Sequence, residues 1–275
     1  MILTIIGNSV IITKKLFINM KESMNMNNHE HNHDQEKMEF FNKEQPLFDK
    51  IYLNGFASYA ESLENLKNAF EGNDFCLRCI DEGTPGGVHS AGSGILRNKE
   101  EVIAELKASG IKKITSHDGC GAAGIFAASH GLDASKSDDY GKEWSSSIAK
   151  ELGIPYEHIG FSEMNRPEKF HVARAAYYDK TGKFDYSKVK ELPSGFIVNS
   201  GIQESTSSLS DVELAFKIAI GSHGSGDLIT EENPFLFVAV ADNEEDLELL
   251  KSDLNKIKES LGSRVRVEGF LAPKE

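Results

Sequence analysis

Short apolar runs and longer segments with apolar residues at helical spacing alternate along most of the chain. The apolar runs predict strands, and they lie at residues 74–80, 111–116, 156–161, 195–202, 235–242 and 264–272. The helical spacing predicts helices at residues 57–70, 98–110, 121–131, 138–152, 210–221 and 244–262. Strands that alternate with helices indicate the α/β class, with a mainly parallel sheet flanked by helices.

The N-terminal part of the chain lacks this regular pattern. Residues 1–20 are apolar, but Asn8, Ser9, Lys14 and Lys15 interrupt them too early for a membrane span. The following residues are polar and rich in Asn and Met, so residues 1–45 are expected to form a flexible polar leader before a single α/β domain at 46–275. The alternating histidines of this leader either hold a metal ion loosely or belong to a solvated tail; they are His29, His31 and His33.

Charge and cysteine content narrow the function. The chain has 275 residues and a formal net charge of -13, and it has no Lys/Arg run, which argues against binding to nucleic acid or to an anionic membrane. A small-molecule substrate remains compatible with this charge. Three cysteines do not form a disulfide framework, so a reducing, cytoplasmic environment is expected and the cysteines are candidates for burial, metal binding or reactivity.

Two of these cysteines and one histidine follow predicted strands. Cys79 lies at the end of the 74–80 run, and His117 and Cys120 lie just past the 111–116 run. Functional groups collect at the carboxyl ends of parallel strands, and neighbouring strands are only about 5 Å apart. Two thiolates and one imidazole are the ligand set of a catalytic zinc with an open fourth position. Cys120 also begins a predicted helix, whose dipole favours the thiolate.

Two other interpretations compete with an open zinc site. Cys76 and Cys79 form a CxxC pair, which together with His117 and Cys120 can make a closed, structural zinc site. Against this, residues three apart on a continuous strand point to opposite faces, so Cys76 is expected in the core. The third interpretation is that these residues are buried independently of one another.

The motifs "CIDE", "VHSAGSG" and "SHDGCGA" resemble the β-carbonic anhydrases, over residues 74–131. The family pattern is Cys-x-Asp-x-Arg, then an Arg-Asn-Ala-Gly loop, then His-x-x-Cys-Gly-Ala. The resemblance implies a zinc-site core at residues 73–131, with an elaborated C-terminal α/β half from about residue 187. It also implies that Cys79, His117 and Cys120 bind zinc and that Asp81 is the catalytic carboxylate beside the metal.

The chain departs from the family pattern at two arginines. Gly83 replaces the arginine that pairs with the aspartate in the family, and His89 replaces the arginine of the loop. Without an arginine partner, Asp81 is expected either to bind the metal and close the site or to pair with Arg78, Arg97 or another arginine.

The expected activity is the hydration of CO2 to bicarbonate by a zinc-bound hydroxide, a lyase reaction. Asp81 is expected to orient the hydroxide, and the Gly-rich loop is expected to contact substrate or product through His89, Ser90, Gly92 and Ser93. His89 is either a proton shuttle or a loop histidine bonded to the backbone. His223, in a second Gly-rich turn, is either a ligand contact or part of a surface turn.

Other functions remain open from the sequence. Hydrolysis of CS2 or COS uses the same site, and a non-catalytic zinc-binding module is the alternative of a different class. A nucleotide loop is disfavoured because "GTPGGVHSAGSG" lacks both GxGxxG and the Lys-Ser/Thr of a phosphate-binding loop. The resemblance further implies a homodimer, with the helix predicted at 57–70 as a candidate for reaching across to the partner.

Overall fold

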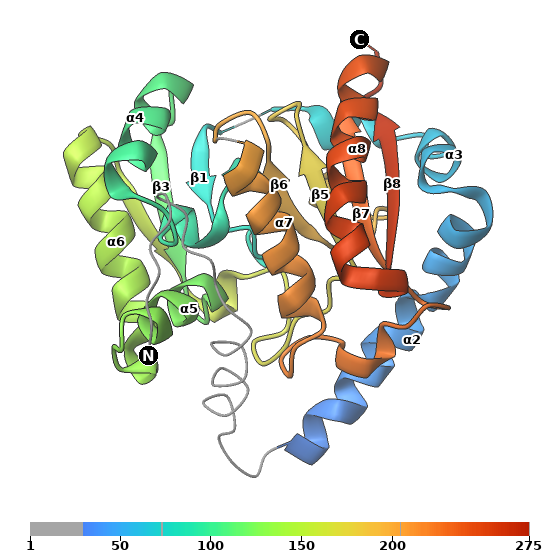
Figure 1. Ribbon diagram of the computed structural model, residues 1–275, viewed down its shortest axis with the longest axis horizontal. Coiled ribbons are helices and arrows are strands. Elements are labelled where there is room, and N and C mark those ends of the chain that lie inside the picture. Colours follow the sequence, from blue (N-terminus) through green and yellow to red (C-terminus); the bar gives the residue numbers. More distant parts are fainter. Residues whose placement is uncertain (1–29, 73, 204, 275) are drawn as a thin grey trace.

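The structure, a computed structural model, describes residues 30–72, 74–203 and 205–274. The chain is an α/β protein with two four-stranded sheets, each entirely parallel, flanked by helices (Figure 1). This architecture confirms the fold class expected from the sequence.

The first sheet has the strand order β2-β1-β3-β4. Its strands are β1 (Cys76–Arg78), β2 (Val88–His89), β3 (Lys113–His117) and β4 (Tyr156–Ile159). The second sheet has the order β6-β5-β7-β8, and its strands are β5 (Ala175–Asp179), β6 (Phe196–Asn199), β7 (Phe235–Ala241) and β8 (Val265–Leu271). The second sheet therefore begins at β5, earlier than the boundary near residue 187 that was expected for the C-terminal half.

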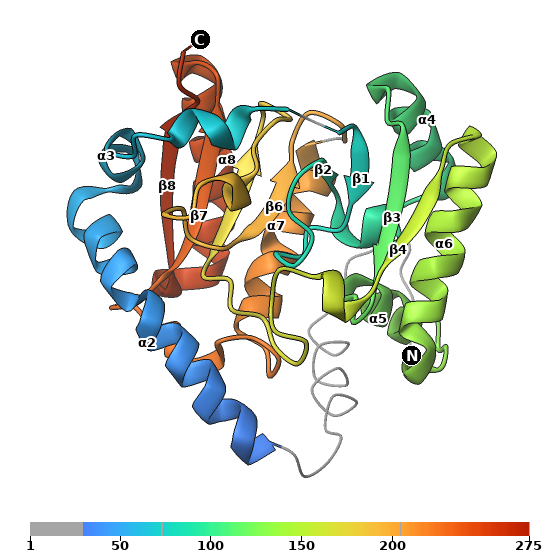
Figure 2. The same cartoon turned by 180° about the vertical axis from the view of Figure 1, so that it is seen from behind.

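Helices cover the two faces of the sheets unequally. One face carries α4 (Lys99–Ser109), α5 (Gly121–Ser129), α6 (Ser137–Leu152), α7 (Ser205–Ala219) and α8 (Glu244–Leu261) (Figure 1). On the opposite side, α2 (Glu30–Asn54) and α3 (Phe56–Glu61) run along the second sheet only (Figure 2). Short 3-10 turns connect several of these elements.

The two sheets meet edge to edge, where β2 lies beside β6. The backbone N–H of His89 donates to the side-chain oxygen of Asn199 at 2.6 Å, and the N–H of Ile197 donates to the carbonyl of Ile80 at 3.2 Å. The segment that follows β1 is therefore held against the second sheet.

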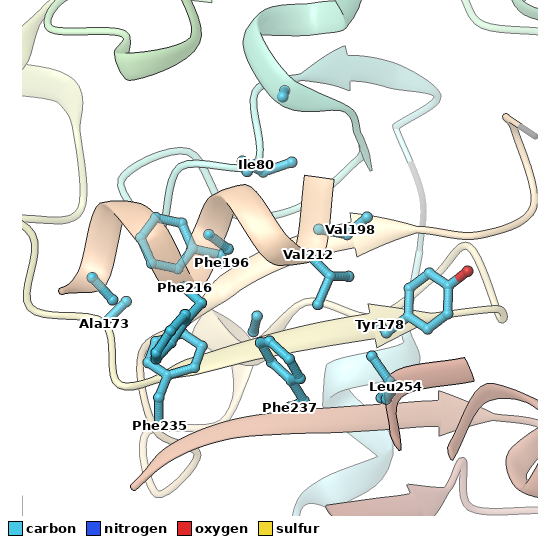
Figure 3. Close-up of a cluster of buried hydrophobic side chains, with 14 of the residues drawn as sticks. Ile80, Ala173, Tyr178, Phe196, Val198, Val212, Phe216, Phe235, Phe237 and Leu254 are labelled. Carbon is cyan, nitrogen blue, oxygen red and sulfur yellow. The ribbon is translucent and has the colours of Figure 1, made fainter. Parts of the chain in front are cut away.

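The largest core cluster fills the space between the second sheet and α7 and α8 (Figure 3). Phe216 of α7 packs edge-on against Phe235 and Phe237 of β7, with ring centroids 5.7 and 6.3 Å apart. Ile80 and Phe196 belong to the same cluster, so this core continues to the end of β1. Burial of such large side chains supplies most of the free energy that keeps the sheet and helices together.

Two predicted elements differ from the structure. Residues 30–45, expected within the flexible leader, belong to α2, because Phe41 and Phe48 of this helix are buried around Arg174, at 3.7 and 3.9 Å from its guanidinium. The single helix expected at 57–70 is split into α3 and a 3-10 turn at Leu66–Phe70. His29 and the side chains of His31 and His33 lie outside the described residues.

Among the described helices, none is both long and apolar enough to cross a lipid bilayer.

Candidate metal centre

Cys79, His117 and Cys120 come together in the structure as a buried cluster. One ligand atom from each side chain lies within 4.8 Å of the others, and the two sulfur atoms are 3.9 Å apart. Each of the three residues is at most 5 % exposed. This group can hold a metal ion through two sulfurs and one nitrogen.

The parallel pairing of β1 with β3 brings the three residues together. Cys79 directly follows β1, and His117 is the last residue of β3. Cys120 is the N-cap residue of α5, one short turn beyond His117. The cluster therefore lies at the carboxyl ends of adjacent parallel strands, where the sequence pattern predicted it.

One hydrogen bond fixes which nitrogen of His117 is available to a metal. Its Nδ1 lies 2.8 Å from the carbonyl oxygen of Asp118, which can only accept, so Nδ1 carries the proton. Nε2 is buried and has no well-aligned hydrogen bond among the described residues. In the neutral ring Nε2 carries the lone pair that a metal ligand requires, and it lies beside two sulfurs; second-shell bonds commonly set the tautomer of ligating histidines.

The electrostatics of the cluster reflect its burial. The hydrogen bond with Cys120, together with burial, raises the pKa of the Cys79 thiol well above its ordinary value. Burial on its own lowers the pKa of His117, but Cys79 and Asp81 outweigh it and raise that pKa to about 9. A bound cation would lower the pKa of both thiols and of the imidazole, because these groups bind a metal in their deprotonated forms.

Cys76 does not belong to the cluster. It is fully buried in β1, and its sulfur lies 3.8 Å from the carbonyl oxygen of Leu77. Burial raises the pKa of its thiol to about 11, so it stays protonated. The strand alternation that separates Cys76 from Cys79 was the reason for expecting Cys76 in the core, and the structure places it there.

Arg166 is the partner of Asp81. Its Nε and Nη2 donate to the two carboxylate oxygens at 2.7 and 3.0 Å, in the bidentate geometry of a guanidinium and a carboxylate. Neither arginine suggested by the sequence takes this position, because Arg78 pairs with Asp74 and Arg97 pairs with Glu105.

Gly83 explains how Arg166 reaches the site. A Cβ atom at Gly83 would lie 2.6 Å from the Met164 side chain and 3.0 Å from Cγ of Arg166. The backbone N–H of Gly83 also donates to Asp81 at 2.7 Å, and its carbonyl accepts from Asn165 at 2.8 Å. The missing side chain at position 83 thus leaves the space that the segment carrying Arg166 fills.

Asp81 is buried beside the cluster and is ionised. Burial alone raises its pKa, but the charges of His171, His117 and Arg166 together hold this pKa below its usual range. Its Oδ2 lies 4.0 Å from Nε2 of His117, and both of its oxygens accept hydrogen bonds from Arg166. The carboxylate therefore lies next to the candidate metal-binding atoms, but both of its oxygens are hydrogen-bonded to Arg166.

A second buried pair lies next to Asp81. Glu82 is fully buried, and its carboxylate accepts from the backbone N–H of Val172 at 3.0 Å and pairs with Nδ1 of His171 at 2.8 Å. The same Nδ1 is 3.9 Å from Oδ2 of Asp81. His223, which the sequence left open as a ligand contact, is exposed and contributes its carbonyl oxygen to the N–H of His171 at 2.6 Å.

The predicted loop residues are buried and bonded to the protein. The backbone N–H of Gly92 donates to the sulfur of Cys79 at 3.1 Å, which favours the thiolate. Ser93 donates its hydroxyl to the carbonyl of Thr115 at 2.6 Å, and Ser90 donates to Asp211 at 3.1 Å. These contacts show Gly92 beside a sulfur of the candidate metal cluster and the two serines in structural hydrogen bonds.

His89 links Cys79 to the second sheet. Its Nδ1 lies 2.6 Å from the carbonyl oxygen of Cys79, and its backbone N–H is held by Asn199, whose amide donates to Asp179 at 2.7 Å. Burial lowers the pKa of His89 to about 4. This geometry matches the backbone-bonded interpretation of His89 and not a proton shuttle, which needs a pKa near neutrality.

A small cavity opens beside the cluster, with about the volume of one water molecule. Its polar lining residues are Cys79, Asp81 and His171. Its remaining wall is apolar or small and is lined by Ile80, Gly121, Ala122, Phe196, Leu214 and Ile218. The candidate site thus combines a metal-binding cluster, a charged pair and a narrow apolar space.

Three residues of this site were not predicted from the sequence: Glu82, Arg166 and His171. Glu82 follows Asp81 directly, and a second acidic residue next to the catalytic candidate was a signal in the sequence that could have predicted its place in the site. Arg166 and His171 lie in or beside an irregular segment between β4 and β5, where no periodicity or motif marks them.

Comparison of the chain with models of protein families, with curated proteins and with solved structures found no match. The resemblance to the β-carbonic anhydrases therefore still depends on the three motifs alone, and the homodimer stays a prediction.

Proposed function

We propose that the chain is a zinc enzyme that hydrates CO2 to bicarbonate. The observation that carries this proposal is the buried Cys79, His117 and Cys120 cluster with the Arg166–Asp81 pair beside it. Two sulfurs that bind one zinc ion tetrahedrally lie about 3.8 Å apart, and the sulfurs of the cluster are 3.9 Å apart. Two thiolates and one imidazole select zinc over hard cations such as magnesium.

A zinc ion with one open position lowers the pKa of a coordinated water toward about 7, which supplies hydroxide near neutral pH. The protein's part is to keep that position open and to orient the water. Arg166 holds Asp81 by both oxygens, which removes the carboxylate as a fourth ligand. Asp81 nevertheless lies close enough to His117 to accept a hydrogen bond from water in the cavity.

The cavity supports a very small, uncharged substrate. Its wall includes Ile80, Phe196 and Leu214, which cannot hydrogen-bond a polar substrate. The apolar wall favours ligands with little hydration to lose, such as CO2, although a space of about one water molecule must widen to admit it. CS2 and COS have the same linear shape, so hydrolysis of either is the second candidate reaction at this site.

Cys76 argues against the non-catalytic alternative. A closed structural zinc needs a fourth protein ligand, and Cys76 is separated from the cluster by the strand. X-ray absorption of the zinc-loaded protein tests this point. Two sulfur ligands, one nitrogen and one light oxygen ligand are expected, whereas three sulfur ligands would contradict an open site.

Stopped-flow measurement of CO2 hydration by the zinc-loaded protein tests the reaction itself. We expect turnover that depends on zinc content and is abolished by a chelator. Parallel assays with CS2 and COS separate the two candidate reactions. A protein that binds one zinc per chain and turns over none of the three substrates would overturn the proposed function.

A further inference from the structure

The Glu82–His171 pair is not needed to hold a metal, yet it is buried beside the metal-binding cluster. Glu82 is fully buried and His171 is 7 % exposed, and their side chains are 2.8 Å apart. Burying two titratable groups costs free energy unless they are paired with each other. Such a pair beside the metal-binding cluster is therefore a candidate for a role in the site. The N–H of Val172 satisfies the second oxygen of Glu82, so this carboxylate is fixed in place.

The pairing sets the tautomer of His171. A carboxylate accepts hydrogen bonds, so the Nδ1 that faces Glu82 carries a proton, and in the neutral ring Nε2 keeps the lone pair. Among the described residues, no hydrogen bond to this Nε2 is formed. The ring of His171 lies 5.5 Å from that of Phe196 and lines the same cavity as Cys79 and Asp81. His171 therefore offers a proton acceptor to a small molecule in that cavity.

We propose that His171, oriented by Glu82, is a catalytic base that accepts the proton released when the water consumed in the reaction becomes hydroxide. This role rests on the proposed function. The O–H bond of that water breaks, its electron pair stays on oxygen, and the proton forms a new N–H bond at Nε2 of His171. Glu82 stabilises the resulting imidazolium through Nδ1–H, and the imidazolium then gives its proton to solvent buffer, so the cycle uses no oxidant or reductant.

The other polar groups at the site are less suited to this role. Both oxygens of Asp81 are bonded to Arg166, and its pKa is held low, so it is a poor proton acceptor. His89 uses Nδ1 to bind the carbonyl of Cys79, is fully buried and does not line the cavity. A second metal ion at Asp81, Glu82 and His171 is disfavoured because existing hydrogen bonds already engage all three ligand atoms.

Kinetics with external buffers test the proposal. In zinc-loaded His171→Gln, we expect kcat for CO2 hydration to fall at least about tenfold at low buffer concentration, because a glutamine cannot carry the proton. Added imidazole is expected to restore kcat, while kcat/KM and zinc content stay within about twofold of the wild type. The matched control is His130→Gln, since His130 is exposed at the end of α5 and bonds only to its own turn.

A spectroscopic measurement on the unaltered protein keeps the test independent of folding and of turnover. Nitrogen-15 NMR of labelled histidine is expected to show His171 as the Nδ1–H tautomer, and Glu82→Gln is expected to lose this preference. An Nε2–H tautomer in the wild type would overturn the proposal. So would a His171→Gln protein that keeps full kcat, or one whose lost kcat imidazole does not restore.

The two proposals fail in different ways. If the zinc-loaded wild type does not turn over CO2, the proposed reaction is wrong, and so is the proton-acceptor role of His171. Wild-type turnover combined with either contrary result for His171 leaves the reaction in place and removes only the role of His171.

Discussion

Arg166 binds Asp81 through two parallel hydrogen bonds of 2.7 and 3.0 Å, although the two residues lie on either side of the whole β3–β4 region of the chain. Both side chains are 3 % exposed, so the pair is almost completely removed from water. This contact ties the irregular segment after β4 to the loop after β1. Arg166 thus takes the place of the arginine that the motif around Asp81 lacks, although it comes from a different part of the sequence.

Replacing Arg166 by lysine tests whether the bidentate geometry matters as well as the charge. Lysine keeps the charge but cannot hold both oxygens of Asp81, so we expect activity or zinc affinity to fall roughly 10- to 100-fold. Zinc titration and CO2 hydration measure the two effects separately. Arg97→Lys, which loosens a guanidinium paired with Glu105 instead, is the matched control and is expected to change neither.

Cysteine variants test the assignment of the metal ligands. Cys120→Ser is expected to lose zinc, because an alcohol is a far poorer ligand than a thiolate. Cys76→Ser is the matched control and is expected to retain one zinc per chain, since its sulfur faces the carbonyl of Leu77. Metal analysis of both purified variants decides the point: full zinc retention in Cys120→Ser would remove this residue from the site.

Asp81→Asn separates metal binding from catalysis. The three ligands remain, so zinc content is expected to be unchanged. CO2 hydration is expected to fall at least about tenfold, because the neutral amide no longer orients the water as a pure acceptor and leaves Arg166 without its charge partner. An Asp81→Asn protein with wild-type turnover would contradict the role given to this carboxylate.

Gly92 tests the close packing of the loop against the metal-binding sulfurs. Its φ is +54°, and a Cβ atom there would lie 2.6 Å from Ile95 and 3.0 Å from Ala122. Gly92→Ala is therefore expected to destabilise the fold by about 1–3 kcal/mol and to weaken zinc binding, because the strained backbone shifts the N–H that contacts Cys79. Gly124→Ala, with nothing within 4 Å of the added Cβ, is expected to be neutral or stabilising in thermal unfolding.

Glu44 gives the stability a pH dependence. Burial raises its pKa from 4.5 to about 7, despite the nearby charge of Arg174. Between these values the folded chain holds a proton that the unfolded chain has lost, so this group stabilises the fold below about pH 4.5 and its contribution disappears as the pH rises through 7.

Glu44→Gln is expected to remove this part of the pH dependence, worth up to about 3 kcal/mol. Urea unfolding of the variant and the wild type at a series of pH values measures the difference. The exposed Glu39→Gln on the same helix serves as the control. Parallel stability curves for Glu44→Gln and the wild type between pH 4.5 and 7 would contradict the prediction.

Local pattern was enough to predict the strands and helices on which the ligands lie. The apolar run at 111–116 and the helix at 121–131 correspond to β3 and α5, and a parallel arrangement puts their junction next to the end of β1. Cys79, His117 and Cys120 are close in sequence to these ends. To predict that these three residues come together, it was therefore enough to expect that β1 and β3 pair in parallel.

Elements without periodicity were predicted poorly, for a physical reason. Residues 30–45 are polar overall, but α2 is held by a few buried side chains, including Phe41 and Phe48, whose rings pack against the guanidinium of Arg174. Such a helix depends on tertiary contacts far along the chain, which average polarity does not reveal.

The sequence by itself determined the α/β class, the positions of the candidate metal ligands and the separation of Cys76 from Cys79, because these follow from periodicity and from the ends of parallel strands. Only the tertiary structure decided the partners of Asp81 and Glu82. Arg166 and His171 come from an irregular segment whose position depends on contacts with the loop at Gly83 and with the carbonyl of His223. Hydrogen bonds between such distant segments form only after the sheets are assembled, so no local pattern records them.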